Sequence, residues 1–187
     1  MQPPERGWTI RPATMADAAL LERLIDVTAR SMHEYSDAQL DVAIGSIFGL
    51  DRQLIRDQTY FAVEAGTELI ACGGWSRRNA RFGADRMAGL EAEALDPARD
   101  AARIRAFFVH PDWSRRGVGR ALLAHCEATA AIGGFHRLEL MATLPGVRLY
   151  AACGFTAGEP SPHTLPNGMS VALVPMYKAL VPTPPSQ

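Results

Sequence analysis

The segment 114–120 combines positive charge with little side-chain bulk, a composition typical of an anion-binding loop. Its charged and small residues are Arg115, Arg116, Gly117, Gly119 and Arg120. An apolar segment ends just before it and an amphipathic pattern begins within it, so it lies where a strand passes into a helix. A helix N-terminus presents unpaired N–H groups and a partial positive charge. Because glycine leaves those groups open and arginine adds fixed charge, the segment predicts a cradle for a pyrophosphate.

A simpler interpretation is that the two glycines only shape a turn and that the arginines are solvated. The segment is not a P-loop, because the lysine and the Ser/Thr after it are missing. It is not a dinucleotide fingerprint either, because the third glycine and an acidic residue further along are not in place. The pattern alone therefore leaves both interpretations open.

Tyr150, in the segment Leu149–Phe155, is the best candidate for a group that donates a proton. A phenol stays protonated at neutral pH and carries a hydrogen-bond donor, so it can act as a general acid. The alternative is that Tyr150 packs in the core and that its hydroxyl bonds to the backbone.

Together the two segments resemble the motifs of the GNAT acetyltransferases, the Gcn5-related N-acetyltransferase family. The first family motif is a strand ending in apolar-x-Val-His-Pro, then Gln/Arg-x-x-Gly-x-Gly/Ala and a helix, and residues 107–119 are similar to it. The second motif, Phe/Leu-Tyr-x-x-x-Gly-Phe, is similar to residues 149–155. The segments 10–14 and 70–75 also fit the family's first and third strands. The resemblance thus covers about residues 8–178.

The resemblance implies an α/β fold with a mixed, mostly antiparallel central sheet, flanked by helices and splayed between two central parallel strands. It implies acetyl-CoA as cosubstrate and direct transfer of the acetyl group to an amine. Phe107, Phe108 and Val109 would hold the pantetheine arm, the first and last of them by backbone groups, and residues 115–120, Val118 included, would wrap the pyrophosphate. A backbone N–H near Val109 would stabilise the oxyanion, and Tyr150 would protonate the departing thiolate.

Three positions depart from the family pattern. Ser114 replaces the Gln/Arg that opens the phosphate loop, although Arg115 and Arg116 can supply the charge. Pro145 replaces an asparagine that often contacts the coenzyme, which makes that loop stiffer. The central strand carries arginines where some members have a histidine or glutamate as general base, so the sequence identifies no base.

Those arginines, Arg103 and Arg105, point to one face of the strand because side chains alternate along it. They either form a cationic wall for an acidic or carboxylate-bearing acceptor, or they pair with nearby acids such as Glu91 or Glu93. The family also places the acceptor near the connection of the first two helices, which makes His33 and Tyr35 candidate acceptor residues. His163, in a Pro-rich loop, is a further candidate at the border of that site.

Composition limits the class of function. Hydrophobic residues make up 48% and charged residues 21% of the 187, which is typical of a globular domain. The net charge of −1 argues against nucleic-acid binding. Neither a signal peptide nor an apolar run long enough to cross a membrane is evident, so we expect a cytoplasmic protein. No His/Cys/carboxylate cluster has metal-ligand spacing, so no metal is expected. Three dispersed cysteines are expected to be reduced, namely Cys72, Cys126 and Cys153.

Periodicity predicts the elements that position these residues. Strands are expected at 8–11, 60–64, 69–75, 103–109, 138–142 and 169–177. Helices are expected after the capping boxes Thr14/Asp17 and Ser36/Gln39, the second ending at Gly49, and over 118–132 and 147–152, with a short turn at 54–56. Residues 78–100 have no clear pattern. One domain, 8–178, is predicted between ends expected to be disordered, 1–7 and 179–187.

The acceptor remains open between a small-molecule amine and a protein amino group, and a homodimer is suggested only by the habit of the family. The alternative function is a non-catalytic acetyl-CoA-binding module that acts as a sensor or interaction partner. The missing base and Pro145 favour this alternative, whereas Tyr150 and the two loop glycines favour an enzyme.

Overall fold

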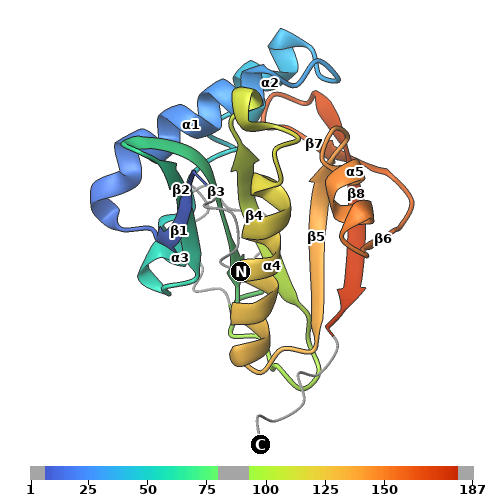
Figure 1. Ribbon diagram of the computed structural model, residues 1–187. Helices are drawn as coiled ribbons and strands as arrows, with labels where there is room; N and C mark the ends of the chain where they lie inside the picture. The colour runs from blue at the N-terminus through green and yellow to red at the C-terminus, as the bar shows by residue number, and fades with distance from the viewer. Residues whose placement is uncertain (1–6, 80–92, 181–187) are drawn as a thin grey trace, which may run out of the picture.

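A computed structural model describes residues 7–79 and 93–180 of the chain. Its backbone is organised around an eight-stranded sheet in the order β1-β2-β3-β4-β5-β8-β6, with β7 paired to β8 (Figure 1). The strands are β1 Thr9–Pro12, β2 Tyr60–Ala65, β3 Glu68–Ser76, β4 Ala102–Val109, β5 Arg137–Thr143, β6 Thr156–Ala157, β7 Ser161–Thr164 and β8 Ser170–Ala179. Among the strands of the described residues only the pair β4–β5 is parallel, so the mixed, mostly antiparallel sheet is confirmed.

Helices cover both faces of this sheet. They are α1 Ala18–Arg30, α2 Asp37–Ala43, α3 Arg52–Arg56, α4 Val118–Ile132 and α5 Val147–Ala152. The buried face of α1 packs with α2 and α3 in one apolar cluster. That of α4 packs in a second cluster, and Figure 1 shows α4 lying across the sheet. The sheet therefore separates two cores, and α4 packs against its central strands.

The two parallel strands separate after a short contact. They pair only through Ala102 with Leu138 and Arg103 with Glu139. Further along, β4 bulges, because two of its residues, Ala106 and Phe107, lie opposite the single residue Gly73 of β3. A bulge bends its strand and increases the local twist. The bend accompanies the separation of β4 from β5, so the splayed parallel strands expected from the sequence are confirmed.

The bulge is held by a side chain from β2, two strands away in the sheet. Ala106 has a positive φ of 47°, which is uncommon for a residue with a Cβ. The hydroxyl of Tyr60, which is fully buried, donates a hydrogen bond of 2.8 Å to the Ala106 carbonyl. Gly73 is required opposite, since a Cβ there would overlap the Phe107 ring.

Local sequence signals predicted most helix ends correctly. Both capping boxes are present, at Thr14 and at Ser36. The predicted end of the second helix at Gly49 was wrong: α2 ends at Ala43, and Gly45 follows with a φ of 82°. A left-handed glycine just after a helix is a standard stop, so the earlier glycine ends it.

The remaining differences lie in the second half of the chain. The strands β6 and β7 form where only a loop was expected, both paired to β8. In the segment 78–100, Arg78 bridges to Ala94, and Glu91 is outside the described residues. β8 extends to Ala179, whereas residues 1–6 and 181–187, expected to be disordered, also lie outside the described part. The three cysteines are free thiols.

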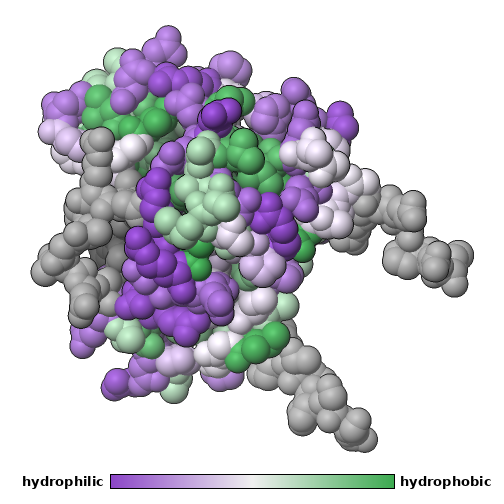
Figure 2. Space-filling view, turned by 90° about the vertical axis from the view of Figure 1, so that its left-hand side faces the viewer, coloured by the Kyte–Doolittle hydropathy of each residue, from purple (hydrophilic) through white to green (hydrophobic). Residues whose placement is uncertain are grey.

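The exposed surface over α1 is mixed in character. Figure 2 shows hydrophilic areas next to smaller hydrophobic ones on the side that faces left in Figure 1. Exposed apolar side chains near that helix are Met15, Leu20 and Val27. In the described residues no helix combines the length and the apolar character needed to cross a membrane.

Gly74 provides a test of the tight contact between β3 and the start of β2. A Cβ at this position would overlap the Thr59 carbonyl oxygen and approach the Tyr60 backbone. We expect Gly74→Ala to lower the free energy of unfolding by roughly 1–3 kcal/mol, because overpacking forces the backbone apart. In the control, Gly7→Ala adds a Cβ that meets nothing within 4 Å, so its effect should stay within about 0.5 kcal/mol. Urea unfolding of both variants measures the difference, and equal stabilities would contradict the packing described.

Candidate active site

A narrow cavity of about 90 Å³ lies where β4 and β5 part. Its walls come from β4, β5, the α1–α2 side of the sheet and α5, and they include Met32, Phe48, Arg105, Phe107, Phe108, Met141, Thr143, Tyr150 and Leu173. Four of the predicted site residues, Arg105, Phe107, Phe108 and Tyr150, are therefore brought together in one cleft. We call this cavity the cleft.

The backbone of β4 is available on the side of the cleft. β4 is paired with β3 as far as Val109, but with β5 only as far as Arg103. In the described residues, the N–H and C=O groups that point toward β5 beyond Arg103 thus lack a neighbouring strand. Such an unpaired edge can accept an extended chain as if it were another strand.

The turn that connects β4 to α4 has a restrained backbone conformation. A short 3-10 turn, Pro111–Trp113, follows β4, and the Nδ1 atom of His110 accepts a hydrogen bond from the Asp112 N–H at 3.3 Å. Arg115 and Gly117 then adopt positive φ angles of 61° and 84°, and Gly117 is the N-cap of α4. Left-handed backbone favours glycine, so Gly117 fixes where the helix starts.

The predicted phosphate loop is exposed and cationic. Arg115, Arg116 and Arg120 are exposed, and the Arg116 guanidinium lies 5.1 Å from the centre of the Trp113 ring. A Cβ on Gly117 would meet no atom within 4 Å, so the space above the helix N-terminus is open. The arrangement has the charge, the N–H groups and the room that a pyrophosphate needs.

Gly119 has a second role that the sequence did not reveal. A Cβ there would lie 3.1 Å from a Leu149 methyl and 3.3 Å from a Val109 methyl. The missing side chain thus lets the first turn of α4 approach both α5 and the end of β4. Val118, beside it, is fully buried in the core under α4.

Aromatic packing fixes Tyr150 at the wall of the cleft. Its ring makes edge contacts with Phe107 and Phe155, with centroids 6.0 Å and 5.7 Å apart. Burial raises the pKa of the Tyr150 hydroxyl, which therefore stays protonated at neutral pH. Within residues 7–79 and 93–180 this hydroxyl has no hydrogen-bond partner. The alternative of a core tyrosine bonded to backbone thus holds for the ring but not for the hydroxyl.

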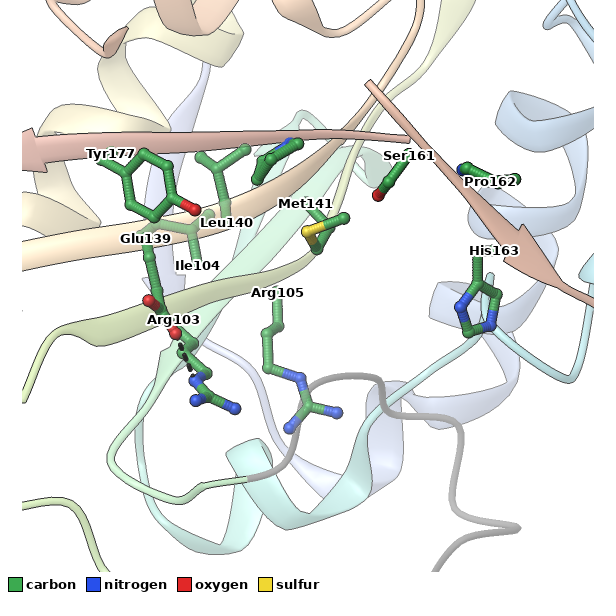
Figure 3. A pocket seen from close by; sticks show the side chains of 11 residues that line it. Arg103, Ile104, Arg105, Glu139, Leu140, Met141, Ser161, Pro162, His163 and Tyr177 are labelled. Atoms are coloured by element: carbon green, nitrogen blue, oxygen red, sulfur yellow. Dashed lines mark ion pairs between the residues drawn. The ribbon is translucent and has the colours of Figure 1, made fainter. Parts of the chain in front are cut away.

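A second and larger pocket adjoins the cleft. It has a volume of about 420 Å³ and lies over β4, β5, β7 and β8 (Figure 3). Its lining is Arg103, Ile104, Arg105, Glu139, Leu140, Met141, Ser161, Pro162, His163, Pro175 and Tyr177. Ile104, Arg105, Leu140 and Met141 line both cavities, so the two adjoin along β4 and β5. We call this second cavity the lateral pocket.

Both arginines of β4 line the lateral pocket and both are paired with acids. The Nε atom of Arg103 lies 2.7 Å from a Glu139 oxygen. An Nη atom of Arg105 lies 3.0 Å from Asp51, and both of these side chains are only 8% exposed. Pairing with acids is thus observed for both arginines, through Glu139 and Asp51. Of the two acids named from the sequence, Glu93 forms neither of these pairs and Glu91 lies outside the described residues. The cationic wall for an acceptor stays a prediction. Asp51 is also the N-cap of α3, where its carboxylate accepts from the Gln53 N–H.

The other acceptor candidates are dispersed. His163 lines the lateral pocket, as Figure 3 shows, whereas His33 is exposed and lines neither cavity. Tyr35 is buried, and its hydroxyl donates to the Ala172 carbonyl at 2.9 Å and accepts from the Leu144 N–H at 3.0 Å. Burial raises the pKa of Tyr35. This hydroxyl joins the connection of α1 and α2 to β8 and to the end of β5, so Tyr35 supports the cleft from outside its lining.

The chain is similar to known acetyltransferases both in sequence profile and in fold. The sequence profile described as the Acetyltransferase (GNAT) family matches residues 21–155. A comparison with curated proteins gives no match.

Among solved structures, a GCN5-related N-acetyltransferase from Rhodopseudomonas palustris has a TM-score of 0.68 at 19% identity, over 92% of this chain and 95% of that one. The putative acetyltransferase YncA from Salmonella typhimurium, solved with its cofactor acetyl-CoA, has a TM-score of 0.63 at 17% identity, over 97% and 99% of the two chains. The PaiA N-acetyltransferase from Thermoplasma acidophilum, in complex with coenzyme A, has a TM-score of 0.64 at 13% identity, over 92% and 98%. At these identities the likeness establishes a shared fold. In the part of the chain that the structure describes, no group of three potential metal ligands is found.

The two hydrogen bonds of Tyr35 predict a structural effect that can be measured apart from activity. Tyr35→Phe leaves the Leu144 N–H without its partner, so we expect the free energy of unfolding to fall by about 1–3 kcal/mol. Tyr177→Phe is the matched control, because Tyr177 is 51% exposed and its loss of a hydroxyl should cost at most about 0.5 kcal/mol. Chemical unfolding measures both. An unchanged stability in Tyr35→Phe would instead favour a direct role in binding the acceptor.

Proposed function

Because the chain belongs to the GNAT family of acetyltransferases, we propose that it transfers an acetyl group from acetyl-CoA directly to a primary amine. The observation that carries this proposal is the cleft, where β4 presents an unpaired backbone edge next to the Tyr150 ring. Two of the solved structures with this fold contain coenzyme A or acetyl-CoA, which supports the same cosubstrate here.

The cosubstrate would span from the exposed loop to the cleft. The pyrophosphate would lie on residues 115–120, where Gly117 leaves open space and three arginines supply charge. The pantetheine arm would follow the free edge of β4, bonded to backbone groups of Phe107 and Val109. Phe108 points to the other face, where its side chain is buried among the residues under α1, so it would contribute only backbone.

In the reaction the amine nitrogen would attack the thioester carbonyl. A new C–N bond forms while the C–S bond breaks, and the backbone N–H near Val109 would stabilise the oxyanion that develops. Tyr150 would give its proton to the departing sulfur, because a phenol is protonated at neutral pH and carries a hydrogen-bond donor. The attacking amine must lose a proton, for which water serves in the absence of an assigned base.

The location, the oligomeric state and the acceptor class complete the proposal. A cytoplasmic location and a homodimer remain predictions from the sequence and the family. The acceptor class, a small-molecule amine or a protein amino group, is likewise proposed. The alternative, acetyl-CoA binding without turnover, is tested by the measurements below.

Calorimetric titration with acetyl-CoA tests the phosphate loop. Gly117→Glu places a carboxylate in the open space before α4, so we expect it to weaken binding by at least about tenfold. The control is Gly117→Asn, which is uncharged and tolerates the left-handed backbone better than most residues, so its affinity should stay within about threefold of the original. Absence of binding to the unaltered protein would refute the proposed function, and equal loss in both variants would indicate strain instead of charge.

Tyr150→Phe tests the general acid. The ring contacts with Phe107 and Phe155 remain, whereas the proton donor is lost. We therefore expect kcat for thiol release to fall by about 100-fold or more. Affinity for acetyl-CoA should be nearly unchanged, as calorimetry would show. An unchanged kcat would exclude the acid role, and binding without any turnover in the unaltered protein would support the sensor alternative.

A further inference from the structure

The lateral pocket carries more positive charge than its ion pairs first suggest. Arg103 and Arg105 both face it, and Figure 3 shows their side chains extending the same way from β4. Of their two acidic partners, only Glu139 lines the pocket. Asp51 is not part of the lining and is itself 8% exposed. The wall of the pocket thus presents two guanidinium groups and one carboxylate.

Neither guanidinium is fully compensated by its protein neighbours. Burial and the charge of Arg103 lower the pKa of Arg105, in spite of the opposing effect of Asp51. Arg103 bonds the neutral Asn79 oxygen at 2.9 Å, and its Nη1 atom is buried without a hydrogen-bond partner among the described residues. An anionic group placed over the two arginines would lower the cost of keeping them close together.

The rest of the lining fits an acidic group at the end of a hydrocarbon chain. The remaining polar side chains, Ser161, His163 and Tyr177, carry hydrogen-bond donors. Apolar side chains make up the remainder, namely Ile104, Leu140, Met141, Pro162 and Pro175. Hydrogen-bond donors combined with apolar walls suit oxyanion recognition together with methylene packing.

Arg105 connects the two cavities, because it lines both the cleft and the lateral pocket. An acceptor whose amine enters the cleft can therefore extend its far end toward the arginines of the lateral pocket. A linear amino acid is the simplest chain with an amine at one end and a carboxylate at the other.

We propose that the lateral pocket binds a carboxylate of the acceptor, so that this enzyme acetylates amines that bear a carboxylate at a distance, with Arg105 as the selecting residue and Arg103 beside it. This inference rests on the proposed function, because it assigns the acceptor class of the same reaction. It makes Arg105 a binding residue for the acceptor, held in place by Asp51.

Matched acceptors test the carboxylate directly. Initial rates of thiol release are measured with 6-aminohexanoate, hexylamine and 1,6-diaminohexane, which differ only at the far end of one chain. We expect kcat/KM for the amino acid to exceed that for hexylamine by at least about tenfold, the scale of one charge-assisted contact. Equal values, or a preference for the diamine, which would point to Glu139, would overturn the proposal. A stronger preference for 5-aminopentylphosphonate, which has the same five methylene groups, would overturn the carboxylate assignment in favour of a phosphate.

Variants show whether the arginine causes the preference. Arg105→Met alone would leave Asp51 buried without its partner, so it is combined with Asp51→Asn. In this double variant the ratio of the two kcat/KM values should fall to near one. Arg99→Met is the control, since Arg99 is 82% exposed and outside the pocket lining, and it should keep the original ratio. A ratio retained in the double variant would overturn the role of Arg105.

Calorimetry separates failure of this inference from failure of the proposed function. If the unaltered protein does not bind acetyl-CoA, the proposed function itself fails. If acetyl-CoA binds, a second titration with 6-aminohexanoate and then hexylamine, in the presence of coenzyme A, measures acceptor binding without turnover. Tighter binding of the amino acid supports the proposal, and equal binding or none overturns it.

Discussion

β4 and β5 pair over only two residues, and the shape of the site follows from this early separation. Backbone N–H and C=O groups of a central strand need partners, and a strand that leaves its neighbour exposes them. The bulge at Ala106–Phe107 lets β4 bend away, and Tyr60 takes up the carbonyl that the bulge displaces. The cleft, the orientation of Phe107 toward Tyr150 and the space beside Arg105 all follow from that one bend.

Features encoded by a few consecutive residues could be predicted from the sequence. The capping boxes and the helix Val147–Ala152 depend on local backbone preferences, and they were predicted correctly. The partners of Arg103 and Arg105 could not be predicted, because Asp51 and Glu139 lie more than thirty residues away and their approach depends on tertiary packing. The strands β6 and β7 were missed for a similar reason, since their short, Gly- and Pro-containing surroundings form strands only against β8.

The lateral pocket contains a buried ion pair that the free energy of folding alone would not favour. Removing two ions from water costs several kcal/mol per ion, and their attraction often only offsets that cost. The pair Arg105–Asp51 is nevertheless buried at the junction of the cleft and the pocket. Because α3 begins at Asp51, the cap of one helix and the orientation of a pocket arginine depend on the same carboxylate. A surface element far from the cleft along the sequence thus takes part in shaping the acceptor side.

The hydroxyl of Tyr35 restricts how the α1–α2 connection can move relative to the strands beside the cleft. It joins the α1–α2 connection to β8 and to Leu144, and nearby the Gln39 side chain donates to the Ser170 carbonyl at 2.6 Å. These hydrogen bonds attach the α1–α2 connection to β8 and to the residue that follows β5. The connection can therefore move relative to β5 and β8 only if these hydrogen bonds break.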